Sequence, residues 1–395
     1  APTPGITPLA SPTATPTYDP GPAGELLATG NRRLDAGDIS GALNSYSLAI
    51  QADHSYAEAY YRRSLAYLAL GDYKAALADL TLALDIDPYH SGAYVARARV
   101  YAEQGSVALA LGDLMQAEAI NPRNGETYLV RGRLLRLQGE IGHALDDLNR
   151  AVVLMPDHAL AYYERALLHR QAGNNELALI DLNVALSLQP DHPEAHYARA
   201  EILAAEGRSE EAIVDYEAAR DLGLESVGLF VALGRAYLET GDTASARETL
   251  AGAARFAPFD SDVHYWLGLA LFVDRDFTGA VTEANAVLAL APASVEALSL
   301  RAASRMNLGE WQAAIDDFAA AYALDETYAE ALFGIAQVYL LEGRPLDAAR
   351  ALEEYLAAAP PDAPNRPAAV VLLDALRQGV LATPTAAPVQ IPRLP

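Results

Sequence analysis

The chain has 395 residues, 52% of them hydrophobic, and its 52 acidic residues outnumber its 28 basic residues to give a formal net charge of −24. This charge repels a phosphate backbone, and no stretch reaches the roughly 18 consecutive apolar residues that a transmembrane helix needs, so we expect neither a nucleic acid partner nor a membrane span. The chain has no cysteine, which excludes disulfide scaffolds, zinc ribbons and thiol nucleophiles.

Residues 1–22 form a segment rich in proline and threonine, a composition that builds no core and favours an extended chain. Its candidate acceptors for an O-linked glycan are Thr3, Thr7, Thr13, Thr15 and Thr17. The start at Ala1 predicts a mature, exported chain, secreted or at the surface of a cell. A chain trimmed at this point would begin in the same way. Abundant alanine and arginine beside one lysine, Lys74, indicate a GC-rich bacterial genome.

From residue 23 to residue 362 the sequence repeats with a period of 34 residues. Counted from the first residue of each unit, glycine occupies repeat position 15 in nine units and Arg275 in the tenth, while alanine occupies position 20 in all ten. The units are 23–56, 57–90, 91–124, 125–158, 159–192, 193–226, 227–260, 261–294, 295–328 and 329–362. The period predicts one structural element repeated ten times.

The pattern inside a unit predicts two helices. In residues 57–90, Tyr60 and Leu68 fall on one helical face, and Gly71 then ends the helix. A second helix carries Leu80 inward and stops at Pro88. Each unit is therefore expected to be a helical hairpin.

These spacings resemble the tetratricopeptide repeat family over residues 23–362. The resemblance implies an all-α, right-handed superhelical solenoid of ten helix-turn-helix hairpins with a concave groove. One hairpin cannot cover its own apolar face, so neighbouring hairpins are expected to stack. The resemblance also implies a scaffold that binds a protein or peptide in its groove.

Arginine at repeat position 7 occurs with aspartate at position 23 in the same six units. The pairs are Arg63 with Asp79, Arg97 with Asp113, Arg131 with Asp147, Arg165 with Asp181, Arg199 with Asp215, and Arg301 with Asp317. Because the two residue types occur together, we predict an ion pair that joins the two helices of each hairpin.

The resemblance implies that positions 5 and 9 of the first helix face the groove. Residues of the types enriched at binding hot spots occupy these positions. They are Tyr61, Tyr163, Tyr197, Tyr265 and Phe333 at position 5, and Arg99, Arg133 and Arg235 at position 9, with Arg136 and Arg170 nearby at position 12. The alternative is that the tyrosines seal neighbouring repeats and expose only their hydroxyl groups.

Three other kinds of site are not indicated. Members of the family that grip a chaperone tail use a lysine and asparagine clamp, which pairs such as Tyr61 with Leu65 replace here. The spacing of His192 and His196 could seat a metal ion, but we predict solvated loop histidines and no cofactor. No phosphate-binding loop, dinucleotide fingerprint, HExxH motif or nucleophile elbow is present, so we predict that the protein is not an enzyme.

The C-terminal end is predicted to hold a capping helix within residues 363–380 and a proline-rich tail over residues 381–395. A cap normally turns a polar face outward, but Ala368 to Leu373 are all apolar. This end supports a second hypothesis, a structural protein that forms head-to-tail oligomers or extracellular filaments through residues 1–22, 366–380 and 381–395.

Overall fold

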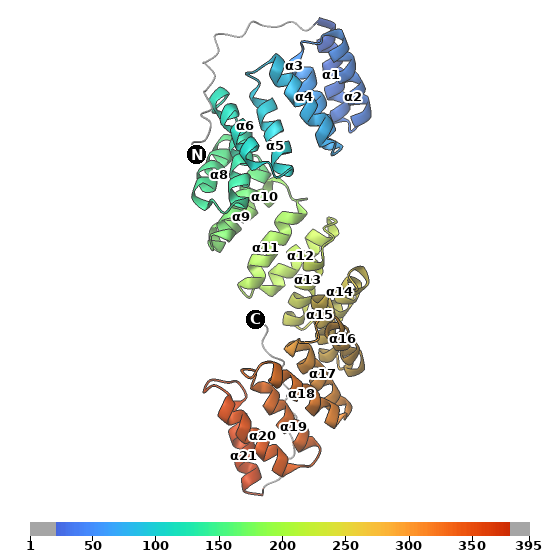
Figure 1. Ribbon diagram of the computed structural model, residues 1–395, viewed down its shortest axis with the longest axis vertical. Coiled ribbons are helices and arrows are strands. Elements are labelled where there is room, and N and C mark those ends of the chain that lie inside the picture. The colour runs from blue at the N-terminus through green and yellow to red at the C-terminus, as the bar shows by residue number, and fades with distance from the viewer. Residues whose placement is uncertain (1–20, 380–395) are drawn as a thin grey trace. The chain divides into compact units, whose positions relative to one another are not determined.

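The computed structural model describes residues 21–379, and every regular element among them is an α-helix (Figure 1). The chain divides into an N-terminal unit that ends at Asp191 and a C-terminal unit that starts at His192. The N-terminal unit contains α1 (Gly21–Asp35), α2 (Ile39–Ala52), α3 (Ala57–Ala69), α4 (Tyr73–Ile86), α5 (Ser91–Glu103), α6 (Val107–Ile120), α7 (Gly125–Leu137), α8 (Ile141–Leu154), α9 (Ala159–Gln171) and α10 (Asn175–Leu188). The C-terminal unit contains α11 (Pro193–Ala205), α12 (Ser209–Asp221), α13 (Val227–Thr240), α14 (Thr243–Phe256), α15 (Ser261–Val273), α16 (Phe277–Leu290), α17 (Val295–Leu308), α18 (Trp311–Leu324), α19 (Glu330–Leu341), α20 (Pro345–Ala358) and α21 (Arg366–Arg377).

Each 34-residue unit of the sequence contains two helices that pack on each other, and within each compact unit the second helix of a hairpin also contacts the first helix of the next. This confirms the predicted all-α repeat fold. Gly71 ends α3 with a φ of 72°, in the left-handed region that glycine adopts at little cost. At the same repeat position Arg275 adopts a φ of 63°, so the turn persists where the glycine is missing.

The two helices of a hairpin approach closely at repeat positions 8 and 20. The alanines at position 20 are 0% exposed in all ten repeats: Ala42, Ala76, Ala110, Ala144, Ala178, Ala212, Ala246, Ala280, Ala314 and Ala348. At position 8, a Cβ atom added to Gly132 would lie 2.7 Å from Cγ of Leu148 on the second helix. A larger side chain at either position would therefore separate the helices.

The structure corrects the start of the predicted repeat region. Helix α1 includes Gly21 and Pro22, which the sequence placed in the extended segment, because proline loses no hydrogen bond in the first turn of a helix. The last helix, α21, runs from Arg366 to Arg377, inside the range 363–380 in which the sequence places it. Residues 1–20 with their threonines and the tail 381–395 lie outside the described residues.

All six predicted ion pairs between arginine and aspartate are present. Each arginine donates from Nε and Nη2 to the two carboxylate oxygens of its aspartate over 2.6–2.9 Å. The six aspartates are only 3–7% exposed. Bidentate bonds to a buried carboxylate fix the two helices of a hairpin in register.

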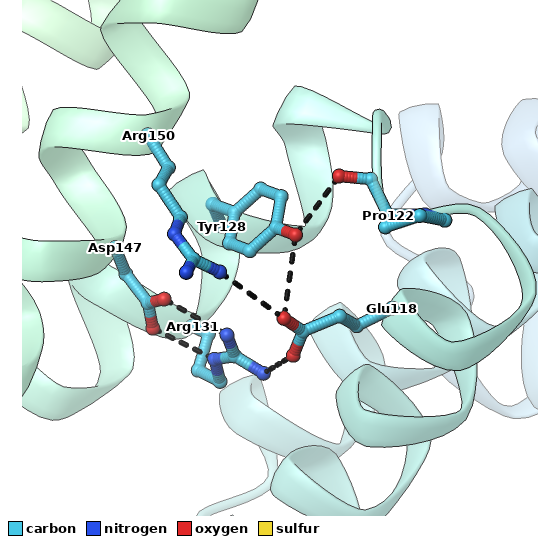
Figure 2. Close-up of polar contacts among 6 residues, drawn as sticks. All are labelled: Glu118, Pro122, Tyr128, Arg131, Asp147 and Arg150. Atoms are coloured by element: carbon cyan, nitrogen blue, oxygen red, sulfur yellow. Dashed lines mark hydrogen bonds and ion pairs between the residues drawn. The ribbon is translucent and has the colours of Figure 1, made fainter.

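Arg131 also joins one repeat to the next (Figure 2). Its Nη1 donates over 2.5 Å to Glu118 on α6, while Nε and Nη2 bond Asp147 on α8. Glu118 also accepts a 3.3 Å hydrogen bond from the hydroxyl group of Tyr128 and lies 3.4 Å from Nη1 of Arg150. Four side chains from three helices therefore converge on or beside one guanidinium group.

Histidine replaces arginine in the hairpin of residues 261–294, where position 7 is Leu267. His264 Nδ1 lies 2.6 Å from a carboxylate oxygen of Glu283, and Nε2 lies 3.0 Å from the carbonyl oxygen of Pro258. Both partners are acceptors, so the doubly protonated ring is the form that can donate to both of them. Burial opposes this charge, but the hydrogen bonds to Glu283 and Pro258 and the negative charges of Glu283 and Asp260 together outweigh it and raise the pKa of His264 above its ordinary value.

This raised pKa predicts a pH-dependent stability. A group whose pKa is higher in the folded state stabilises the fold below its unfolded-state pKa, about 6.5 for histidine, and loses this effect as the pH rises through the folded-state pKa. We expect the free energy of unfolding, measured with urea between pH 6 and pH 9, to fall more in the wild type than in His264→Gln. Parallel curves for the two proteins would contradict the assignment.

Candidate functional site

In the N-terminal unit, α7 contacts both α5 and α9, the first helices of the hairpins before and after it. Along them lies a cavity of about 390 Å³, which we call the inner pocket. Its lining residues are Arg99, Ala102, Glu103, Leu129, Val130, Arg133, Leu134, Leu137, Leu160 and Glu164. An apolar surface with a few charged groups is the usual composition of a binding site.

The apolar lining of the inner pocket comes mainly from α7. Leu129 and Leu134 are 3% and 5% exposed, because they also pack in the core of the repeat stack. Leu137, the last residue of α7, is 66% exposed. An exposed leucine beside a pocket lined by buried leucines offers an apolar surface to a ligand.

An ion pair between neighbouring repeats and contacts between histidine and glutamate lie along the first helices. Arg99 on α5 pairs with Glu126 at the start of α7, and Glu126 also lies 3.4 Å from Nε2 of His158. The equivalent glutamate two repeats earlier, Glu58, lies 2.9 Å from Nε2 of His90. These contacts hold successive first helices at fixed positions.

Glu164 is a buried carboxylate in the pocket, with only 3% of its surface exposed. Arg136 donates two hydrogen bonds to its Oε2 atom, from Nη2 over 2.9 Å and from Nε over 3.2 Å. Arg133 approaches its other oxygen, Oε1, over 3.4 Å, and the Arg133 side chain is 52% exposed. The buried charge of Glu164 is therefore neutralised from one side of the pocket.

Two of the eight predicted groove residues, Arg99 and Arg133, lie in the inner pocket. Tyr163 is half-buried on α9, outside the pocket lining. Tyr61 packs at the junction with the next repeat: its ring centroid lies 4.5 Å from that of His90, the last residue of its own repeat, and a Cβ atom on Gly92 of the next repeat would lie 3.1 Å from its hydroxyl oxygen. These contacts fit the alternative prediction that the tyrosines seal neighbouring repeats.

The other four predicted residues belong to the C-terminal unit. Tyr197 donates a 2.9 Å hydrogen bond from its hydroxyl group to Glu201. Burial raises the pKa of Tyr265 to about 12. Its neighbour Trp266 has Arg235 above its ring, 4.7 Å from the centroid. The position of Phe333 corrects the prediction: it is 4% exposed and packs on Tyr355, so it is a core residue rather than a groove residue.

Sequence reasoning missed Glu164 and Leu137. The signal for Glu164 is its repeat position, 6, which holds alanine in four other repeats: Ala28, Ala96, Ala198 and Ala232. Arg62 is the one other charged residue at this position, and Glu164 is the only carboxylate there among the ten repeats. No comparable signal marks Leu137, because leucine at a helix end is common.

The histidines singled out as a metal pair have separate carboxylate partners. His192 Nδ1 lies 3.0 Å from Glu194, and His196 Nδ1 lies 2.8 Å from Asp215. Their side chains are 12% and 15% exposed, so the prediction of solvated loop histidines is wrong. Within residues 21–379 no three histidine, aspartate or glutamate side chains gather as a metal site would require. None of the helices in this range is long and apolar enough to cross a membrane.

Comparison with known proteins agrees with this geometry. A tetratricopeptide repeat model matches residues 129–191, 182–223, 231–295 and 300–363, and related repeat models match residues 30–71 and 57–90. The chain belongs to the tetratricopeptide repeat family. Membership of this family supports a role as a protein–protein interaction scaffold in general. No curated protein matches the chain in sequence.

Solved structures of tetratricopeptide repeat proteins share the fold. PilF of Pseudomonas aeruginosa is 23% identical, with 53% of this chain and 96% of that chain covered and a TM-score of 0.50. A tetratricopeptide repeat protein of Parabacteroides merdae is 21% identical over 63% and 98% of the two chains, with a TM-score of 0.45. Yeast Tom70 is 16% identical over 93% and 98%, with a TM-score of 0.40. At these identities the likeness concerns the fold alone.

Proposed function

We propose that this tetratricopeptide repeat protein is a non-enzymatic scaffold that binds a peptide or protein segment in the inner pocket. The observation that carries the proposal is the exposed Leu137 beside the buried Leu129 and Leu134, with arginine side chains at the rim. Apolar side chains of a ligand would pack on the leucines and be shielded from water, and its polar groups would form hydrogen bonds with the arginines at the rim.

Pre-formed ion pairs support binding by a rigid surface. Arg136 and Glu164 are mostly buried and join α7 to α9, so the pocket is shaped before a ligand arrives. A pre-organised surface binds more tightly because little conformational entropy is lost on association.

The first experiment is selection of random twelve-residue peptides, displayed on phage, against the immobilised full chain. We expect peptides that bind saturably in solution. The complex should have the mass of one 42.0 kDa protein chain and one peptide. If repeated selection yields no saturable binder, the proposal fails.

A second candidate function rests on α21. Val371 is 68% exposed and Val370 is 44% exposed on this last helix, so the first half of its outer face is apolar, while Asp374 and Arg377 are exposed in the second half. Such a face could join copies head to tail, as the sequence also predicted. Light scattering of the full chain at several concentrations distinguishes the two candidates, because only assembly makes the mass rise with concentration.

A further inference from the structure

Arg133 presents a guanidinium group that the protein itself hardly uses. Arg136, only 14% exposed, makes both hydrogen bonds to Glu164. Arg133 makes no hydrogen bond to this carboxylate, and its contact is a longer one of 3.4 Å. With 52% of its side chain exposed, Arg133 can offer several N–H donors to a ligand in the pocket.

The other rim charges differ from Arg133 in their availability. Arg99 pairs with Glu126 of the next repeat. Glu103, one turn further along α5, is exposed, and no hydrogen bond or ion pair engages it within residues 21–379. An acidic group of a ligand would therefore bond Arg133 and be repelled by Glu103.

We propose that the segment bound in the inner pocket carries an apolar side chain next to an aspartate or glutamate. The apolar side chain lies on the leucines of α7, and the carboxylate accepts hydrogen bonds from Arg133. This inference rests on the proposed function and specifies its ligand. It concerns a side-chain carboxylate within the segment, not the carboxylate at the end of a chain.

The acidic preference is local. The chain as a whole carries a net charge of −24 and repels acidic partners at long range, but physiological salt screens such repulsion beyond about 8 Å. At contact distance, charge-assisted hydrogen bonds to a guanidinium group exceed this screened repulsion.

The test uses three peptides built on the tightest binder from the display library, acetylated and amidated at their ends to remove terminal charges. They differ only in the residue next to the apolar anchor, which is aspartate, asparagine or lysine. Fluorescence anisotropy measures their affinity for the full chain. A half-exposed ion pair is worth about 0.2–1 kcal/mol, so the aspartate peptide should bind up to about fivefold more tightly than the asparagine peptide.

Two exposed-rim variants should change this ratio in opposite directions. Arg133→Gln should remove the advantage of aspartate over asparagine and reverse it, because Glu103 still repels the carboxylate, whereas Glu103→Gln should increase the advantage of aspartate. Both residues are exposed, so neither substitution disturbs the core. Melting temperatures of both variants equal to that of the wild type would verify this.

The outcomes separate the inference from the proposed function. Equal binding of the aspartate and asparagine peptides, or tighter binding of the lysine peptide, overturns the acidic preference. If Leu137→Glu nevertheless abolishes binding of all three peptides, the proposed function stands. Peptide binding that is unaffected by Leu137→Glu overturns both.

Discussion

Replacing Arg131 with methionine should lower the free energy of unfolding by about 3–5 kcal/mol, the usual cost of removing one partner of a buried ion pair. Arg131 is 15% exposed and bonds both Glu118 and Asp147. Methionine fills a similar volume but leaves the Asp147 carboxylate, 6% exposed, without its two guanidinium donors. Urea denaturation followed by circular dichroism measures the loss.

Arg208→Met is the matched control. Arg208 also bonds two carboxylates, those of Glu206 and Glu211, over 2.7–3.2 Å, but all three side chains lie at the surface. Exposed pairs contribute little, so this variant should unfold like the wild type. Asp147→Leu added to Arg131→Met should restore part of the stability, because it removes the stranded carboxylate. Equal losses for Arg131→Met and Arg208→Met would contradict the role of burial.

Adding one methyl group at Gly234 should destabilise the protein by about 1–3 kcal/mol, the usual cost of overpacking a core. A Cβ atom at Gly234 on α13 would lie 2.5 Å from Cγ of Leu250 and 2.8 Å from both of its Cδ atoms. Leu250 on α14 is 0% exposed, so it cannot move into solvent. Thermal and urea unfolding of Gly234→Ala measure the effect.

The control is Gly252→Ala in the same hairpin. The atom nearest to its new Cβ would be Nη2 of Arg255, 3.9 Å away. Alanine is favoured over glycine inside a helix by about 0.5–1 kcal/mol, so this variant should be more stable than the wild type. A loss of stability in Gly234→Ala and a gain in Gly252→Ala would show that the close approach of the two helices, not helix propensity, decides the effect at Gly234. Leu250→Ala should relieve part of the Gly234→Ala defect.

Repetition explains why much of the fold could be predicted. Two residue types that occur together in the same repeats and are absent together from the others, such as Arg165 and Asp181, indicate a contact between the two positions. The same comparison predicted the hairpin turns. Each of these features depends only on contacts within one hairpin. The ten repeats carry similar residues at the positions that make these contacts.

The pocket could not be predicted in this way, because it depends on deviations from the repeat. Glu164 occurs once at its position, and its burial depends on Arg136 of the preceding hairpin. Phe333 was misplaced for a similar reason: its position is aromatic and half-buried in four other repeats, but near the end of the stack it contacts Tyr355 and is buried. In the hairpin of residues 261–294, which lacks the arginine at position 7, His264 at position 4 contacts Glu283 at position 23.

The most direct test of ligand binding in the inner pocket compares Leu137→Glu with Val153→Glu. Both replace an exposed apolar residue of the N-terminal unit, 66% and 78% exposed, but Leu137 lies in the inner pocket and Val153 lies in a separate cleft with Pro122 and Tyr128. Isothermal titration with a library-selected peptide should give wild-type affinity for Val153→Glu and no measurable binding for Leu137→Glu. Undiminished binding by Leu137→Glu, or loss of binding only in Val153→Glu, would contradict the inner pocket as the functional site.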